Sequence, residues 1–249
     1  MLKEILPLIP EHFTYVEPYF GGGAVYRAKE PSQGEIINDL NLNVVNFYAV
    51  LKNDFERLKI KITATLHSRA TYKKALFVYH SPELFADAPL IRARAFYVVT
   101  NQWFAHKIGS RGYDSTDCAH TVQRKIDAFA SHLSDRLKYT QIEHNDAHKV
   151  IASRDHKHAF FYLDPPYINT NQWHYAGYSS ENFVRDLEVL ATIQGKFLLS
   201  CFPSDEINAF IKKHKRHVKT FLKPSSAGNR LPAGQGKRKT EVLVANYPI

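Results

Sequence analysis

Short apolar runs alternate with amphipathic segments near the start of the chain. Runs of β-type residues at 13–17 and 35–38 precede a segment, 40–58, in which apolar residues recur three or four positions apart. This spacing lines one face of a helix, whereas short apolar runs bounded by turn residues are typical of strands. The pattern predicts strand, loop, strand and helix in that order, which is how an α/β domain begins.

The same alternation returns in the second half of the chain. The predicted strands are 139–143, 159–163, 196–201, 217–222 and 240–247, and the predicted helices are about 180–193 and 204–214. Strands that alternate with helices favour parallel pairing, because the helix carries the chain back across the sheet. We therefore expect an α/β fold with a parallel or mostly parallel sheet.

Between residues 59 and 138 the strand signals are sparse and helical spacing dominates, for example over 121–137. We interpret this segment as an inserted, mainly helical subdomain. Its basic side chains are interleaved with aromatic ones, a composition that suits phosphates and stacked bases. The basic residues are Arg69, Lys73, Lys74, Arg92, Arg94, Lys107, Arg111, Arg124 and Lys125. A solvated helical lid would explain the same composition equally well.

The charge balance narrows the range of partners. The chain has 249 residues, 44% of them hydrophobic, a formal net charge of +9 and an isoelectric point near 9.4. This excess of positive charge favours a polyanionic partner, either nucleic acid or an anionic membrane surface. No apolar run approaches the roughly 18 residues that a membrane span needs, and the first residues do not build a signal peptide. We expect a cytoplasmic protein that does not enter a membrane.

Metal and redox chemistry find little support in the sequence. Cys118 and Cys201 are the two cysteines, and without a CxxC pair both are expected to be free thiols. His144 and His148 have the spacing of a two-histidine metal site, but no third ligand is evident. Surface or capping roles are favoured for these histidines, and no metal is predicted.

A rigid polar turn follows the apolar run 159–163. Asp164-Pro165-Pro166-Tyr167 comes directly after this predicted strand, which places it at the carboxyl edge of the sheet, where open α/β folds bind ligands. The prolines stiffen the turn. The Asp164 carboxylate and the Pro165 carbonyl can accept the hydrogens of an exocyclic amino group, and Tyr167 can stack on a base rotated out of a duplex. Taken alone, the tetrapeptide is better explained as a rigid surface turn.

A second candidate site follows the first predicted strand. Residues 16–25, VEPYFGGGAV, place three glycines where backbone could approach a ligand closely, although an ordinary glycine-rich turn has the same composition. Asp39, at the end of the second strand, is placed to bind ribose hydroxyls, or Asp39 or Asn38 could cap the helix that follows. Asp146 could bond the adenine of a cofactor or cap the next helix. Both alternatives stay open for each residue.

Together, the segments VEPYFGGGAV, IINDLN, IEHNDA and FYLDPPY, in this order, resemble the Dam-type (D12 class) DNA adenine methyltransferases. The resemblance extends to Gly177-Tyr178-Ser179, Asp186-Leu187, KFLLSC and the closing TEVLV. It implies a Rossmann-like fold that depends on S-adenosylmethionine (AdoMet). The catalytic domain would comprise 1–58 and 139–249, and 59–138 would be a target-recognition insertion. The implied activity is methyl transfer to the exocyclic amino nitrogen of adenine in duplex DNA, with base flipping.

The resemblance also implies a role for each candidate residue. The residues implied to bind AdoMet are Glu17, Phe20, Gly21 and Gly23 at its methionine end, Asp39 at its ribose and Asp146 at its adenine. The residues implied to hold the target base are Asp164, Pro165 and Tyr167. The residues expected at DNA are Lys107 and Arg111 in the insertion and Lys237 and Arg238 in a glycine-rich basic segment. The expected partner is double-stranded DNA, bound by a monomer.

Some features leave alternatives open. Family members generally begin with an aromatic-x-Gly-Gly-Lys-like segment, which is absent from the printed sequence. A start placed too far downstream, weaker cofactor binding and a degenerate, non-catalytic DNA-binding remnant are each consistent with this. Transfer to another planar amino group, on cytosine, RNA or a protein glutamine, is a further alternative, although Asp rather than Ser or Asn at 164 favours adenine. The stretch 101–113 does not match the recognition segment of GATC-specific members, so no target sequence is predicted.

Overall fold

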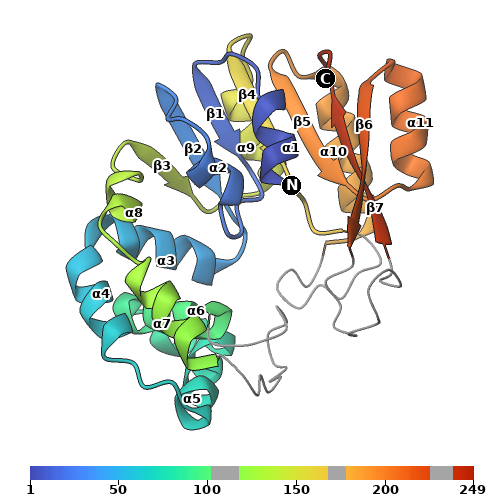
Figure 1. The fold of residues 1–249 in the computed structure, drawn as a ribbon. Coiled ribbons are helices and arrows are strands. Elements are labelled where there is room, and N and C mark those ends of the chain that lie inside the picture. The colour runs from blue at the N-terminus through green and yellow to red at the C-terminus, as the bar shows by residue number, and fades with distance from the viewer. Residues whose placement is uncertain (102–117, 168–177, 225–237) are drawn as a thin grey trace. The chain divides into compact units, whose positions relative to one another are not determined.

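The computed structural model describes residues 1–101, 118–167, 178–224 and 238–249 (Figure 1). These residues form two compact units. The sheet unit comprises Met1–Leu40 and Asn145–Ile249, and the helical unit comprises Asn41–His144. The helical unit thus begins upstream of the predicted insertion, because the helix after the second strand clusters with the helices that follow it.

The described strands form one seven-stranded sheet in the order β3-β2-β1-β4-β5-β7-β6. Their bounds are β1 Thr14–Glu17, β2 Gly34–Asn38, β3 Thr140–Glu143, β4 Ala159–Leu163, β5 Lys196–Cys201, β6 His217–Pro224 and β7 Arg238–Ala245. Strands β2, β1, β4 and β5 pair in parallel, whereas β7 pairs antiparallel with both β5 and β6. The strand order reverses between β1 and β4, which is the position where doubly wound sheets bind ligands. The predicted Rossmann-like α/β fold is confirmed.

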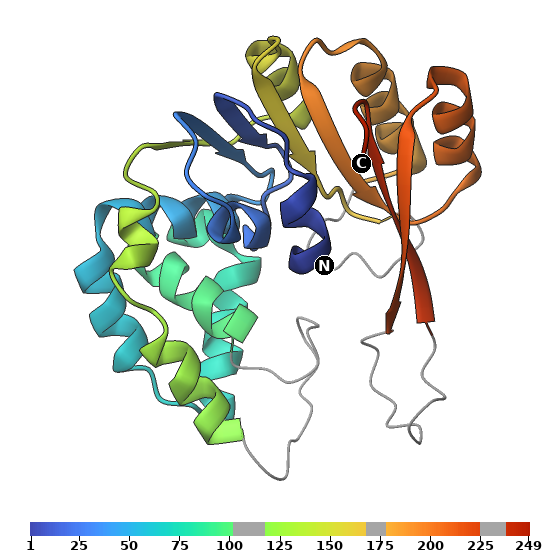
Figure 2. The same cartoon turned by 45° about the horizontal axis from the view of Figure 1, so that its top comes forward.

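Helices cover both faces of the sheet in the sheet unit. They are α1 Leu2–Ile5, η1 Leu6–Leu8, α2 Ala24–Ala28, α9 Ala147–Arg154, α10 Ser180–Thr192 and α11 Asp205–His214. Helices α9, α10 and α11 lie on one face, and α1 lies on the other (Figure 1 and Figure 2). The two longest of these helices begin at side-chain caps, Ser179 for α10 and Ser204 for α11. Their bounds agree closely with the predicted helices.

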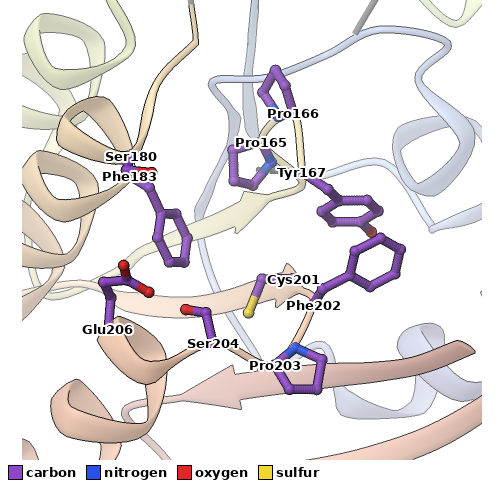
Figure 3. A pocket seen from close by; sticks show the side chains of 10 residues that line it. All are labelled: Pro165, Pro166, Tyr167, Ser180, Phe183, Cys201, Phe202, Pro203, Ser204 and Glu206. Carbon is purple, nitrogen blue, oxygen red and sulfur yellow. The ribbon is translucent and has the colours of Figure 1, made fainter. Parts of the chain in front are cut away.

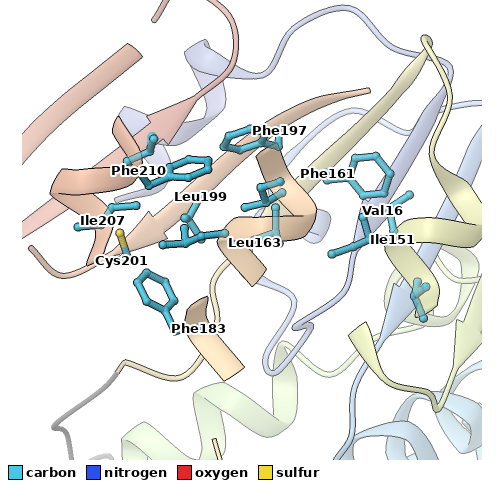
Figure 4. Close-up of a cluster of buried hydrophobic side chains, with 14 of the residues drawn as sticks. Val16, Ile151, Phe161, Leu163, Phe183, Phe197, Leu199, Cys201, Ile207 and Phe210 are labelled. Carbon is cyan, nitrogen blue, oxygen red and sulfur yellow. The ribbon is translucent and has the colours of Figure 1, made fainter. Parts of the chain in front are cut away.

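The main hydrophobic core lies between the sheet and α9, α10 and α11. Phe161 of β4 and Leu199 of β5 are fully buried and meet Phe183 of α10 and Phe210 of α11 (Figure 4). Successive strand residues point to opposite faces, so Tyr162, next to Phe161, lies on the face away from these helices. This alternation separates an apolar face, which holds the fold together, from a face that carries polar groups.

The helical unit is built from short helices. They are α3 Leu42–Asn53, α4 Phe55–Thr63, α5 Arg69–His80, η2 Pro82–Phe85, α6 Pro89–Asn101, α7 Cys118–Asp127 and α8 His132–Asp135. Strand β3 also belongs to this unit. The unit has a small core of its own, in which Tyr72 and Tyr79 of α5 pack against Val98 and Val99 of α6. No helix in the described parts of the chain is both long and apolar enough to cross a membrane.

Two predicted helices of this region are wrong in extent. The predicted helix 40–58 is interrupted at Asp54, whose φ of −144° leaves the helical region, so that α4 starts anew. The predicted helix 121–137 ends early, at Asp127. The Lys59 ammonium donates to the Ile126 carbonyl at 2.7 Å and also to that of Phe129, which satisfies the end of α7 from another helix. This contact comes from tertiary packing and is invisible to local periodicity.

Candidate active site

The turn Asp164-Pro165-Pro166-Tyr167 stands at the carboxyl end of β4. Asp164 is exposed, Pro165 is buried and Tyr167 is half-buried. The Tyr167 hydroxyl donates to Asp164 Oδ1 at 2.8 Å. The Tyr167 ring packs against Phe202, with ring centroids 4.2 Å apart and planes at 34° (Figure 3). The turn therefore presents an exposed carboxylate and an aromatic ring with one face covered.

A buried polar cluster lies beneath this turn. The Tyr167 hydroxyl also lies 3.2 Å from Ser200 Oγ and 3.0 Å from Glu241 Oε1, and Ser200 donates to the same Glu241 oxygen at 2.9 Å. Ser200 on β5 and Glu241 on β7 are 0% and 2% exposed. Burial, reinforced by the charge of Asp164, raises the pKa of the Tyr167 hydroxyl well above its usual range. The phenol therefore keeps its proton at neutral pH.

The glycine loop after β1 has a backbone that only glycine adopts comfortably. Gly21 and Gly23 have φ of 50° and 59°. A Cβ at Gly23 would stand 2.3 Å from the ring of Phe20, which is itself buried, whereas a Cβ at Gly22 would meet no atom within 4 Å. The Gly21 N–H donates to Asp39 Oδ2 at 2.7 Å. The loop is held in place and still leaves open space at its centre.

Glu17, the last residue of β1, is a carboxyl group in an unusual setting. It is 2% exposed, and the Tyr15 hydroxyl donates to its Oε2 at 2.7 Å. Burial, together with the nearby charge of Asp164, raises the pKa of Glu17 to about 8. In the described part of the chain, no basic side chain forms an ion pair with it. A buried acid beside an open glycine loop suits the positively charged end of a ligand.

The structure tests the capping alternative for the polar residues at the end of β2. Helix α3 is capped by Asn41, whose side chain accepts from the Asn43 N–H at 2.9 Å, so neither Asn38 nor Asp39 is its cap. Asn38 instead donates to the carbonyl oxygens of Pro18 and Asn145. It thereby ties the end of β2 to the glycine loop and to the start of the segment that carries α9.

Asp146 is the cap of α9. Its Oδ1 accepts from the His148 N–H at 2.9 Å, which confirms the capping alternative. The side chain remains 42% exposed, so capping does not enclose the carboxylate. Its predicted contact with the adenine of a cofactor stays a prediction.

Comparison with known proteins decides the family. Residues 1–222 match the D12 class N6 adenine-specific DNA methyltransferases. The chain belongs to this family. The type II methyltransferase M1.LlaDCHI of Lactococcus lactis subsp. cremoris is 24% identical to it over 270 residues, which cover 99% of this chain and 91% of that protein. The predicted enzyme, an adenine-specific DNA methyltransferase, is confirmed.

Another sequence relative and a solved structure are less similar to this methyltransferase. The DNA N-6-adenine-methyltransferase of Escherichia phage P1 is 34% identical over 58 residues, which cover 23% of this chain and 8% of that protein. The solved structure of the rRNA methyltransferase aviRa from Streptomyces viridochromogenes is 14% identical and covers 98% of this chain and 81% of its own, with a TM-score of 0.33. A similarity of that size supports no inference about this chain.

The methyltransferase contains a second buried polar cluster, around Asp186, that the sequence reasoning missed. Asp186 on α10 is 0% exposed and accepts from the hydroxyls of Tyr19, at 2.7 Å, and Tyr178. His148 Nε2 lies 2.6 Å from Asp186 Oδ1, and this contact raises the pKa of His148. The expected surface role of His148 is wrong, since its side chain is only 13% exposed. The cluster joins the glycine loop, through Tyr19, to helix α10.

Both clusters left a signal in the sequence. Asp186 lies three residues after Phe183 and four before Leu190, on the apolar face of its helix. Glu241 directly precedes a run of apolar strand residues and is 2% exposed, on the sheet face opposite to that of Val242. A charged residue at a position that should be apolar marks a buried polar contact, although the sequence alone does not name the partner.

The other predicted residues are placed as follows. Lys107, Arg111 and Lys237 lie outside the described residues, and Arg238 is the first residue of β7. Cys201 is a buried free thiol, as predicted, and burial raises its pKa to about 12. Within the described residues, no three His, Cys, Asp or Glu side chains gather in a way that could hold a metal ion.

Proposed function

We propose that this D12 class methyltransferase moves a methyl group from AdoMet to the exocyclic amino nitrogen of an adenine rotated out of duplex DNA. One observation carries the proposal. Glu17 ends β1 and Asp164 directly follows the neighbouring strand β4, at the point where the strand order reverses, and the charge of Asp164 raises the pKa of Glu17. A cofactor carboxyl group and a substrate carboxyl group are therefore close neighbours at one sheet edge.

The residues around the glycine loop fit the cofactor. When bound, AdoMet supplies an activated methyl group on a sulfonium centre. Glu17 would pair with its ammonium group, and the backbone from Gly21 to Gly23 would allow a close approach. Asp39, buried behind this loop, would face the ribose hydroxyls. Asp146 would contact the adenine of the cofactor with Oδ2, because the described contacts of its carboxylate use Oδ1.

The catalytic turn meets the needs of the acceptor nitrogen. The lone pair of an exocyclic amino group is delocalised into the ring, and attack on a sulfonium methyl develops positive charge on the nitrogen. The Asp164 carboxylate and the Pro165 carbonyl would each accept one amino hydrogen, and each preorganised group is worth about 3 kcal/mol. Tyr167 would stack on the flipped base with the ring face opposite Phe202. The turn needs no metal ion for these steps.

The helical unit is the proposed target-recognition part. Arg69, Lys73 and Lys74 on α5 are exposed, which provides positive charge for DNA phosphates. Lys107, Arg111, Lys237 and Arg238 are proposed to contact the same duplex, with the protein acting as a monomer. Neutralising phosphates releases counterions, so DNA binding should weaken steeply as salt is raised.

The proposal is tested with isotopically labelled AdoMet and duplex DNA, followed by digestion to nucleosides. Label in N6-methyl-2′-deoxyadenosine is expected, and label in methylated 2′-deoxycytidine or only in an RNA substrate would overturn the base assignment. Asp164→Ala should abolish transfer and leave AdoMet binding, measured by calorimetry, mostly intact. Asp205→Ala, an exposed aspartate in the first turn of α11, is the matched control and should keep normal activity. Loss of AdoMet binding in Asp164→Ala would instead place this carboxylate in the cofactor site.

A further inference from the structure

Glu241 is a carboxylic acid residue whose side chain is buried against the sheet. It lies on β7, immediately before the buried apolar run Val242–Ala245, and is 2% exposed. Strand β7 pairs with β5, where Cys201 lies opposite Val242 and Ser200 opposite Leu243. Burial of a carboxylate costs free energy unless hydrogen bonds compensate it, so an apolar residue would serve the sheet better here. The contacts of Glu241 indicate why the carboxylate is useful.

The hydrogen bonds of Glu241 lead to the catalytic turn. Its Oε1 receives the Ser200 hydroxyl at 2.9 Å and lies 3.0 Å from the Tyr167 hydroxyl. The same Tyr167 hydroxyl lies 2.8 Å from Asp164 Oδ1. A phenol carries a single proton, so Tyr167 cannot donate fully to Asp164 and to Glu241 at the same time. The two carboxylates therefore compete for one hydrogen.

This competition bears directly on methyl transfer. As long as Tyr167 donates to Asp164, Oδ1 of that carboxylate is already engaged and is a weaker acceptor for the amino group of adenine. If Tyr167 donates to Glu241 instead, Oδ1 no longer receives the Tyr167 hydrogen and is a better acceptor for the amino group. The oxygen of Tyr167 is within hydrogen-bond distance of both acceptors, so only the O–H bond has to rotate, and the ring stays on Phe202.

We propose that Glu241 is a positioning residue for methyl transfer. It accepts the Tyr167 hydrogen and thereby leaves Asp164 to the amino group of the target adenine. Ser200, through its own bond to Glu241, holds the carboxylate in the orientation that receives Tyr167. The proton stays on Tyr167 throughout, and no bond other than hydrogen bonds is made or broken by Glu241. The inference rests on the proposed role of Asp164.

The test is a double-mutant cycle on the single-turnover rate of methyl transfer, with duplex DNA and saturating AdoMet. Glu241→Leu should lower the rate about tenfold or more, because the Tyr167 hydrogen then stays on Asp164. The AdoMet dissociation constant should be unchanged. Glu241→Gln keeps an acceptor oxygen and should restore much of the rate. In a Tyr167→Phe background, Glu241→Leu should cause no further loss, since the hydroxyl through which Glu241 acts is gone.

Two outcomes would overturn the inference. One is a Glu241→Leu variant that melts normally and transfers methyl groups at the wild-type rate. The other is a loss of the same size, within about twofold, in the wild-type and Tyr167→Phe backgrounds, which would mean that Glu241 acts independently of the hydroxyl. If Glu241→Leu does not fold, the cycle is run with Glu241→Gln, whose smaller loss should also vanish with Tyr167→Phe. Glu188 is exposed on α10, so Glu188→Leu is the matched control for replacing a glutamate by leucine, and it should keep the normal rate.

Asp164→Ala separates this inference from the function on which it rests. Normal transfer by Asp164→Ala would overturn the proposed role of the catalytic turn itself. Loss of transfer in Asp164→Ala, together with an unaffected Glu241→Leu, would overturn only the role of Glu241.

Discussion

AdoMet binding should weaken as the pH falls below neutrality, and Glu17 should be the reason. Burial raises the pKa of this carboxyl group to about 8, so the protein without cofactor holds it protonated at pH 7. An ammonium group pairs well only with the ionised form. Binding must therefore displace the proton of Glu17, and this costs more free energy at lower pH.

The magnitude follows from the pKa. With a value of about 8, Glu17 is ionised in about a tenth of the molecules at pH 7 and in about a hundredth at pH 6. Each unit of pH in this range should change the dissociation constant about tenfold, which is about 1.4 kcal/mol. The range must stay at or below pH 7, because the α-amino group of the ligand loses its own proton near pH 8.

The assay is isothermal titration calorimetry of AdoMet between pH 6 and 7, in two buffers with different ionisation enthalpies. The wild type should release close to one proton per AdoMet bound. Glu17→Gln should bind more weakly at pH 7 and lose this part of the pH dependence, whereas Glu11→Gln, an exposed control, should behave like the wild type. The same pH dependence in the wild type and Glu17→Gln would refute the reasoning, because the titrating group would then lie elsewhere.

Two further predictions concern stability. Gly23→Ala should lower the free energy of unfolding by about 1–3 kcal/mol, because φ is 59° and the new Cβ would meet the Phe20 ring. Gly22→Ala, the control, should lower it much less. Equal denaturant midpoints for the two variants would contradict this prediction. Contact with Asp186 raises the pKa of His148 in the folded protein. The contact of the protonated imidazole with Asp186 therefore stabilises the fold fully below the pKa of an unfolded histidine, near 6.5, and this stabilisation is lost as the pH rises through the pKa of the folded state. His148→Gln should therefore lower the melting temperature more at pH 6 than at pH 8.5, and an equal loss at both pH values would count against the pairing.

The sequence by itself determined the elements whose signal is local. Strands β4 and β5 have the predicted bounds to the residue, because each is a short apolar run that ends at a turn. The rigid turn at Asp164 and the glycine loop at Gly21 were recognisable from the residue types that their backbones require. The α/β class and the mostly parallel pairing followed from the alternation of strands and helices, whereas the strand order and its reversal between β1 and β4 come from the structure.

The tertiary structure alone decided which groups meet. Helix α7 ends where Lys59, distant in sequence, satisfies its carbonyl groups, so a continuous helical period did not yield a continuous helix. Strand β7 pairs antiparallel on both sides, and that choice depends on neighbours rather than on its own residues. Tyr167 and Glu241 are 74 residues apart, yet the Tyr167 hydroxyl lies within hydrogen-bond distance of the Glu241 carboxylate. Local patterns report burial and backbone conformation, whereas partners across the sheet are set by the packing of the whole chain.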